Sequence, residues 1–313
     1  MLRKITGALL LLLIVLLLVV VFRKDLTLPK AEVKAKYSLP NSHFINWKGG
    51  ELHYTESGND TNRTVLMIHG FGGSNRDFYM LDSLINKQYH VIRVDLPGFG
   101  LSDFPFAYGQ ISFHDAYAEY FSFLLDTLHI DSCYLMGNSL GGLMSIELIS
   151  QHPDKVKKLV LFNSAGYNLK EVMKTANADF FRLWPVKQFV KKGVPEFMTA
   201  KGISRVAYAQ ELLTPEKITR VNSFWNREGN LRHIVEMANA GEPFDESKIG
   251  RIACPTLVVW GKQDQIIHVE YAEQFHHDIK GSELLIYDSC GHVPMMEKPT
   301  EVQQAVLQFL ARP

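Results

Sequence analysis

This chain of 313 residues has no excess of either charge and contains few cysteines. Lys and Arg together number 33, as do Asp and Glu, so the formal net charge is zero. A surface that binds nucleic acid needs clustered positive charge, and we therefore expect no nucleic-acid partner. The three cysteines, Cys133, Cys254 and Cys290, are odd in number and show no C-x-x-C spacing. The sequence therefore indicates neither a disulfide framework nor a cysteine-based zinc site.

Signatures of bound cofactors are lacking as well. The glycine-rich stretch "HGFGGS" has neither the Lys-Ser/Thr pair of a phosphate-binding P-loop nor the G-x-G-x-x-G spacing of a dinucleotide site. The chain carries no metal or flavin motif, so we expect neither a metal nor another cofactor.

Long hydrophobic runs are also rare, and the one present lies at the amino end. Residues Ile5 to Phe22 carry no charge, and 18 residues at about 1.5 Å each nearly cross a hydrocarbon layer of about 30 Å. A cleaved secretory signal is the alternative, but the run exceeds the usual apolar region of about 7 to 15 residues and no small-residue cleavage site follows. We predict an uncleaved single-pass membrane anchor at residues 1–24. Two basic residues precede it and five soon follow, which favours a cytoplasmic body.

Beyond the anchor, the apolar residues come in short pieces. A polar, proline-bounded tether is expected at 25–42, and "HFINW" with "ELHYTESG" then predicts a β-hairpin. Six apolar runs follow, each succeeded by a loop and a helix-like stretch: "TVLMIHG", "HVIRVDLPG", "CYLMGNS", "KLVLFNSAG", "PTLVVWG" and "SELLIYDSCGH". Such strands alternating with helices predict an α/β fold, in which helices cover both faces of a mostly parallel central sheet.

The alternation of strands and helices stops between residues 167 and 250, where the sequence predicts no strong strand. Large apolar side chains remain frequent there, among them Phe189, Phe197 and Trp225. A linker would not carry so many of them. We therefore predict an inserted helical cap at 167–250, which divides the core into residues 43–166 and 251–313.

The stretch "CYLMGNSLGG" places Ser139 between Gly137 and Gly141, after a predicted strand and before a predicted helix. A G-x-S-x-G sequence in that position forms a sharp turn that strains the serine backbone and exposes its hydroxyl above the sheet edge. The glycines lack the β-carbons that would collide across the turn. We predict that Ser139 is a nucleophile, which then needs a base and an orienting carboxylate.

Four histidines are candidates for the base, because the acid and then the histidine follow the serine in chains built on this turn. These four are His268, His276, His277 and His292. His276 and His277 lie in a helix-like stretch and are most simply surface residues. His292 lies in a Gly- and Pro-marked loop after the last strand, from which a side chain can reach back over the strand ends. We predict His292 as the base.

For the acid, "VVWGKQDQ" places Asp264 on a loop after a buried strand, at the same sheet edge as Ser139. Asp288 is closer to His292 in sequence but lies within or at the end of its own strand. Glu270 begins the next helix, where the helix dipole favours a carboxylate in any case. We predict Asp264 as the acid.

The oxyanion formed during acyl transfer needs a pair of hydrogen-bond donors. The glycines of "MIHGFGGS" let the backbone turn tightly after a strand, so that an N–H can point into the site. We predict the backbone N–H groups of Phe71 and Leu140 as the two donors, Leu140 being the residue after the nucleophile.

The motifs "HGFGGS", "DLPGFGLS", "GNSLGG", "GKQD" and "CGHVPMMEKP", in this order and spacing, resemble the α/β-hydrolase superfamily from about Phe44 onward. They are most similar to bacterial esterases and lipases and to membrane-anchored monoacylglycerol lipases. The resemblance implies the α/β-hydrolase fold and serine-hydrolase chemistry. Haloalkane dehalogenases and epoxide hydrolases of this fold use an aspartate where this chain has Ser139, which argues against both.

The leading hypothesis is therefore a serine hydrolase that cleaves a small-molecule or lipid-like carboxylic ester, such as a monoacylglycerol, through an acyl-enzyme. Carbon–carbon hydrolases of ring-cleavage products share the G-N-S-x-G-G elbow and stay open as an alternative. They typically have an aromatic residue after the catalytic histidine and a Gly-Pro in the oxyanion loop, where this chain has Val293 and "GFGG". A non-catalytic ligand-binding protein is the third possibility, against which the intact Ser, Asp and His set argues. The sequence carries no signal of oligomeric state.

Overall fold

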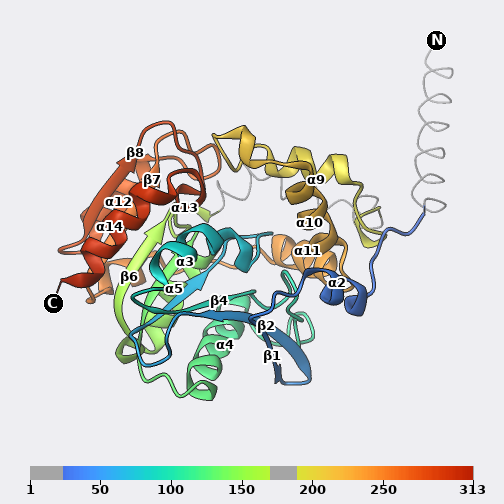
Figure 1. The fold of residues 1–313 in the computed structure, drawn as a ribbon, viewed down its shortest axis with the longest axis horizontal. Helices are drawn as coiled ribbons and strands as arrows, with labels where there is room; N and C mark the ends of the chain where they lie inside the picture. Colours follow the sequence, from blue (N-terminus) through green and yellow to red (C-terminus); the bar gives the residue numbers. More distant parts are fainter. Residues whose placement is uncertain (1–23, 170–188, 313) are drawn as a thin grey trace, which may run out of the picture.

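The computed structural model describes residues 24–169 and 189–312 (Figure 1). Its helices and strands are, in chain order, α2 (Lys30–Tyr37), β1 (Ser42–Trp47), β2 (Gly50–Ser57), β3 (Thr64–Ile68), η1 (Asn75–Phe78), α3 (Tyr79–Ile85), β4 (His90–Val94), α4 (Phe113–Thr127), β5 (Cys133–Asn138), α5 (Leu140–Gln151), η2 (Pro153–Lys155), β6 (Val156–Phe162), α9 (Glu196–Ile203), η3 (Gln210–Leu212), α10 (Pro215–Asn226), α11 (Asn230–Ala240), η4 (Glu246–Arg251), β7 (Thr256–Gly261), α12 (Glu270–Asp278), β8 (Glu283–Tyr287), α13 (Pro294–Glu297) and α14 (Pro299–Ala311).

The strands form one eight-stranded sheet in the order β1-β2-β4-β3-β5-β6-β7-β8. β1 and β2 make the predicted antiparallel hairpin, and β2 also pairs antiparallel with β4. Every other pair of neighbouring strands in the sheet is parallel. The mostly parallel α/β sheet predicted from the sequence is therefore confirmed. Because parallel strands end at the same edge, the loops after β3, β5, β7 and β8 meet there.

Strand β3 illustrates why the chain needs helices on both faces. Successive side chains of a strand point to opposite faces of the sheet. Val65 and Met67 pack with α3 and α14 in one apolar cluster, whereas Leu66 and Ile68 pack with α4 and α5 in the other. All four side chains are fully buried. Alternate residues of this continuous apolar strand therefore lie in two separate cores. Helices on both sides of the sheet cover these cores (Figure 1).

The segment at 25–42, expected to be a tether, contains helix α2 and packs against the rest of the protein. Val33 is buried in a small apolar cluster with Leu101 and Phe224. Tyr37 lies edge-on against Phe224, and its hydroxyl forms a hydrogen bond of 3.0 Å with Ser223. Helix α2 therefore joins the cap helix α10 to the loop after β4.

The described part of the predicted cap, residues 189–250, is helical. Helix α10 contacts both α9 and α11, and the three lie together beside the sheet, yellow to orange in Figure 1. The cap residues 170–188 lie outside the described part of the chain.

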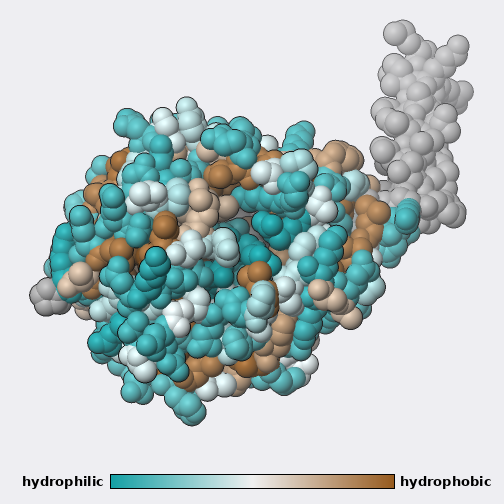
Figure 2. All heavy atoms as spheres, viewed as in Figure 1, coloured by the Kyte–Doolittle hydropathy of each residue, from teal (hydrophilic) through white to brown (hydrophobic). Residues whose placement is uncertain are grey.

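Within residues 24–169 and 189–312, no helix combines the length and the apolar character needed to cross a membrane. The hydrophobic run predicted as an anchor, Ile5 to Phe22, lies outside these residues. On the face shown in Figure 2, hydrophilic residues cover most of the surface and hydrophobic residues are scattered among them.

Candidate active site

Ser139 lies in the turn between β5 and α5, with φ +54° and ψ −118°. A positive φ costs a non-glycine residue free energy, so the surrounding structure must hold it there. A β-carbon on Gly137 would collide with the carbonyl of Gly141, and one on Gly141 would collide with the carbonyl of Ile68 in β3. The two glycines therefore allow the turn to close tightly against the sheet.

His292 and Asp264 meet on the loops after β8 and β7. The distance between His292 Nδ1 and Asp264 Oδ2 is 2.7 Å, and both side chains are buried. The other carboxylate oxygen accepts hydrogen bonds from the backbone N–H groups of Ile266 (2.7 Å) and Ile267 (3.1 Å). Because the carboxylate accepts at Nδ1, that nitrogen carries the proton, and His292 Nε2 is left as a proton acceptor.

The nucleophile turn is tied to the histidine loop by the residue before the serine. Asn138 Nδ2 donates to the carbonyl of His292 and to that of Phe162, each at 3.0 Å. The structure thus joins Asp264 directly to His292, and His292 to the Ser139 turn through the backbone. Within the described residues, Ser139 Oγ itself has no hydrogen-bond partner. In unliganded enzymes this bond is often long and tightens when substrate binds.

Asn163, at the end of β6, was not identified from the sequence. Its side chain donates to Asp264 Oδ2 at 2.6 Å and accepts from the N–H of Gly261 at 3.2 Å. Its backbone has φ +42°. Asn163 and His292 therefore both donate to the same carboxylate oxygen, Asp264 Oδ2. A signal was available, because "NS" directly follows the apolar run "KLVLF" at the edge where the other site residues lie.

Glu297 was also missed, and it holds the histidine loop against the cap. Its carboxylate accepts from the N–H groups of Gly291 (2.8 Å), Tyr208 (2.8 Å) and Ala209 (2.9 Å). In addition, the N–H of His292 donates to the carbonyl of Val206 at 2.9 Å. The residues at 206–209 follow cap helix α9, so the cap and the histidine loop are joined at this point.

The two predicted oxyanion donors belong to the residue after Ser139 and to a turn that contacts Ser139. Leu140 is the first residue of α5, where a backbone N–H has no partner within the helix. Phe71 lies in the turn Gly70 to Gly73, and the N–H of Gly73 donates to the carbonyl of Gly70 at 3.1 Å. A β-carbon on Gly70 would lie 3.1 Å from Ser139 Cβ, so this turn packs directly against Ser139.

Residues that the sequence analysis set aside lie elsewhere. Asp288 is largely exposed and pairs with Lys262 at 2.8 Å. His276 and His277 lie on α12, and Glu270 begins that helix.

Cys290 lies two residues before His292 and is buried. Burial, together with the carboxylate of Glu297, raises the pKa of its thiol. A thiol held in the protonated form is a poor nucleophile, so Cys290 is a weaker candidate for that role than Ser139.

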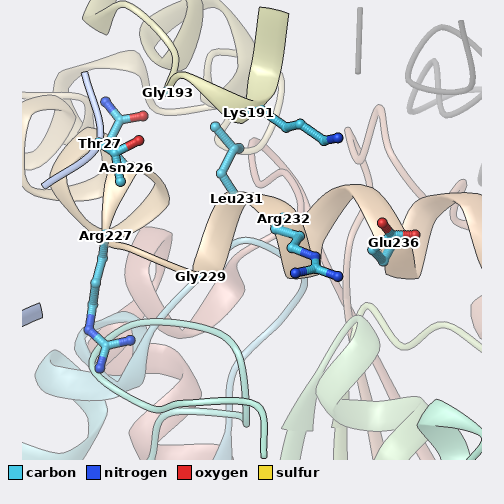
Figure 3. Close-up of a pocket in the computed structure, with 9 residues that line it drawn as sticks. All are labelled: Thr27, Lys191, Gly193, Asn226, Arg227, Gly229, Leu231, Arg232 and Glu236. Carbon is cyan, nitrogen blue, oxygen red and sulfur yellow. The ribbon is translucent and has the colours of Figure 1, made fainter. Parts of the chain in front are cut away.

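A cavity of about 480 Å³ lies between the cap and the N-terminal segment (Figure 3). Thr27, Lys191, Arg227 and Arg232 are among its lining residues, and neither Ser139 nor His292 is one of them. This cavity is therefore separate from the candidate active site.

Comparison with known proteins identifies the family. A sequence profile described as the alpha/beta hydrolase fold matches residues 63–299. A 2-hydroxy-6-oxononadienedioate/2-hydroxy-6-oxononatrienedioate hydrolase of Klebsiella pneumoniae subsp. pneumoniae is 30% identical over 287 residues, covering 87% of this chain and 96% of that protein. The protein of the same name from Escherichia coli is 29% identical over 285 residues, with the same coverage.

Two solved structures extend the comparison. A membrane phospholipase A, described as a bacterial virulence factor, has a TM-score of 0.72 and 26% identity, covering 99% of this chain and 98% of that one. A meta-cleavage product hydrolase from Pseudomonas fluorescens has a TM-score of 0.72 at 20% identity, covering 86% and 97%, which is a likeness of fold alone. Because the profile spans most of the chain and agrees with the sheet order and the nucleophile turn, this chain belongs to the α/β-hydrolase superfamily.

Proposed function

We propose that this α/β hydrolase cleaves carboxylic esters through an acyl-enzyme on Ser139. One observation carries the proposal: the strained serine turn lies at the same sheet edge as the buried His292–Asp264 pair and is tied to it through Asn138. As Ser139 Oγ attacks the carbonyl carbon, His292 Nε2 takes its proton and then delivers that proton to the leaving alcohol. The N–H groups of Phe71 and Leu140 stabilise the oxyanion. Water, activated by the same histidine, then releases the acid.

The proposed substrate is a lipid-like ester, such as a monoacylglycerol or a related lysolipid. The predicted apolar anchor, which makes this a single-pass membrane protein in our proposal, supports this class. So does the likeness to a membrane phospholipase A along nearly the whole chain. Positive-inside counting favours a cytoplasmic catalytic domain. Val293 and "GFGG" stand where ring-cleavage hydrolases typically have other residues, which favours an ester over a carbon–carbon substrate.

The direct test compares wild type and Ser139→Ala on a series of acyl esters, using full-length protein in detergent. Loss of the nucleophile is expected to lower kcat by roughly 10⁴-fold or more, because only the oxyanion hole and binding remain. Ser145→Ala is a matched control, since Ser145 is a buried serine of the following helix α5. A Ser139→Ala enzyme with wild-type ester turnover would overturn the proposal.

Carbon–carbon bond hydrolysis of an anionic diketone is the second candidate. The named relatives favour it, and a cluster of cations fits the charge of such a substrate. Lys217 and Arg220 on cap helix α10 form no ion pair with any other residue that the structure describes. Burial lowers the pKa of Arg76, and the neighbouring charge of Arg220 lowers it further. Burial likewise lowers the pKa of Lys217, where Asp77 and Glu297 oppose the shift and Arg220 adds to it.

The members of this cluster, Arg76, Lys217 and Arg220, lie near one another, because the charge of Arg220 acts on both of the other groups. Asp77 abuts Gly73 of the turn, and Lys217 Nζ lies 3.7 Å from the sulfur of Met296, which follows the histidine. Unpaired cations at this point suit a substrate that carries a carboxylate or phosphate. The cluster therefore fits both a dicarboxylate diketone and a lysophospholipid.

Arg220→Gln distinguishes charged from neutral substrates. We expect it to raise KM for an anionic substrate about 10-fold or more, because one charge-assisted contact is lost, and to leave neutral monoacylglycerol turnover within twofold. Assays with lysophosphatidate, a monoacylglycerol and a vinylogous dienedioate give the comparison. Turnover of the dienedioate alone by the wild type would favour the carbon–carbon reaction over ester cleavage. An equal change in KM for all three substrates in Arg220→Gln would contradict the proposed role of Arg220.

A further inference from the structure

The oxyanion turn, Gly70 to Gly73, is held by different parts of the protein at its inner and outer ends. The Phe71 ring packs edge-on against the core residue Phe99. Gly72 has φ +71°, as the third residue of the turn Gly70 to Gly73 requires, and the Phe71 side chain is 44% exposed. On the inner side, His69 Nδ1–H donates to the carbonyl of Gly70 at 2.7 Å, while its Nε2 accepts from the N–H of Leu96 at 2.9 Å. The inner end is thus fixed by the core.

The outer end is fixed by the cap. Trp225, near the end of α10, donates its indole N–H to the carbonyl of Gly72 at 2.8 Å. The indole lies flush with the turn, because a β-carbon on Gly72 would be 3.4 Å from Trp225 Nε1 and Cζ2. At the other edge of the indole, a β-carbon on Gly202 in α9 would be 3.2 Å from Trp225 Cη2. Glycines on two segments therefore leave the space that this indole fills.

Consecutive planar peptides carry this contact to the reacting site. A trans peptide is rigid, with its C=O and N–H pointing in opposite directions. The carbonyl of Gly72, which accepts from Trp225, belongs to the same peptide unit as the N–H of Gly73. This N–H donates to the carbonyl of Gly70 at 3.1 Å. The peptide that contains the Gly70 carbonyl has the N–H of Phe71. The indole N–H thus constrains the direction of the proposed oxyanion donor through two peptide planes.

We propose that Trp225 is a positioning residue, which aligns the Phe71 N–H through the Gly72 carbonyl and so makes the oxyanion hole depend on the docked cap. This inference rests on the proposed function. Trp225 acts through the turn and touches no reacting atom in this mechanism, so its loss lowers the rate of the chemical step without weakening substrate binding.

The test compares Trp225→Phe with wild type in the full-length protein, measuring kcat and KM for an ester. Phenylalanine keeps much of the ring and removes the N–H. We expect kcat to fall about 10-fold with KM unchanged within twofold, because one hydrogen bond of the turn is lost. Trp47→Phe is the matched control, because Trp47 is a buried tryptophan of the edge strand β1, packed on Phe106 and Tyr120. It is expected to leave kcat unchanged.

A second variant separates alignment from packing. Benzothienylalanine at position 225 has nearly the shape of tryptophan but carries sulfur in place of the N–H. It is expected to show the same loss of kcat, with thermal unfolding as in wild type. Wild-type kcat in this variant, or a change confined to KM, would overturn the inference. If Ser139→Ala keeps full activity, the proposed function fails, whereas an inactive Ser139→Ala with an unaffected Trp225 variant rejects only the role of Trp225.

Discussion

At the scale of single residues, Asn163 provides a sharp test of how the acid is held. Asp264 Oδ2 receives hydrogen bonds from both Asn163 and His292, at 2.6 and 2.7 Å. Asn163→Ala removes one of them and leaves the carboxylate free to turn away from the imidazole. We expect kcat to fall roughly 10- to 100-fold with little change in KM, because a hydrogen bond to a charged group contributes about 1.5–3 kcal/mol.

Steady-state kinetics of Asn163→Ala and of Asn59→Ala check this expectation. Asn59 is an exposed asparagine in the loop before β3 and serves as the control. Equal kcat values for Asn163→Ala and wild type would show that the backbone N–H groups of Ile266 and Ile267 suffice to orient the acid.

At the scale of elements, helix α11 carries His233, which is buried among aromatic rings. His233 is fully buried among the rings of Phe99, Phe104 and Phe113. Its Nε2 lies 2.9 Å from the Tyr117 hydroxyl, whereas Nδ1 has no partner among the described residues. Burial lowers the pKa of His233 from 6.5 to about 3. The folded protein therefore keeps this imidazole neutral at pH values where the unfolded chain protonates it.

The difference between the folded and unfolded pKa of His233 sets the direction in which stability changes with pH. Between pH 6.5 and about 3 the unfolded chain binds more protons at this position, so stability falls as the pH falls. From pH 7 to pH 5 the loss is about 2 kcal/mol. Denaturant unfolding at both pH values should show this loss in wild type and a smaller one in His233→Phe. The exposed His268 gives a control, His268→Gln. Parallel profiles of wild type and His233→Phe would contradict the expectation.

Helix α2 provides the second test at this scale. An eight-residue helix is marginal by itself, so its order depends on tertiary contacts. Val33→Ala removes two buried methyl groups from the cluster with Leu101 and Phe224 and should lower the free energy of unfolding by roughly 2 kcal/mol. Ala35→Ser on the exposed side of the same helix is the control. Equal stability of Val33→Ala and wild type, measured by urea unfolding, would show that α2 does not contribute as described.

At the scale of the whole molecule, the sheet was predicted well because its strands have local signals, and the candidate site residues were chosen by their place after such strands. The strands have continuous apolar runs, and Ser139, Asp264 and His292 follow three of them in the order that the nucleophile turn requires. Parallel strands end at one edge, so topology alone brings these loops together.

The features that were missed depend on pairs far apart in the chain. Asn163 and Asp264 are 101 residues apart, and Trp225 and Gly72 are 153 apart. No local pattern marks such pairs. The packing of α2 has the same origin, because its polar composition resembles a tether while Val33 and Tyr37 contact the cap residues Phe224 and Ser223.

The central claim is that Ser139 is the nucleophile and that His292 activates it. Its most direct test is peptide mass mapping after brief treatment of the full-length protein with a fluorophosphonate. We expect one phosphonyl adduct on the peptide that contains Ser139, none in Ser139→Ala, and labelling slowed at least 100-fold in His292→Gln, because the hydroxyl then lacks its base. An adduct on another residue, or labelling of His292→Gln at the wild-type rate, would contradict the claim.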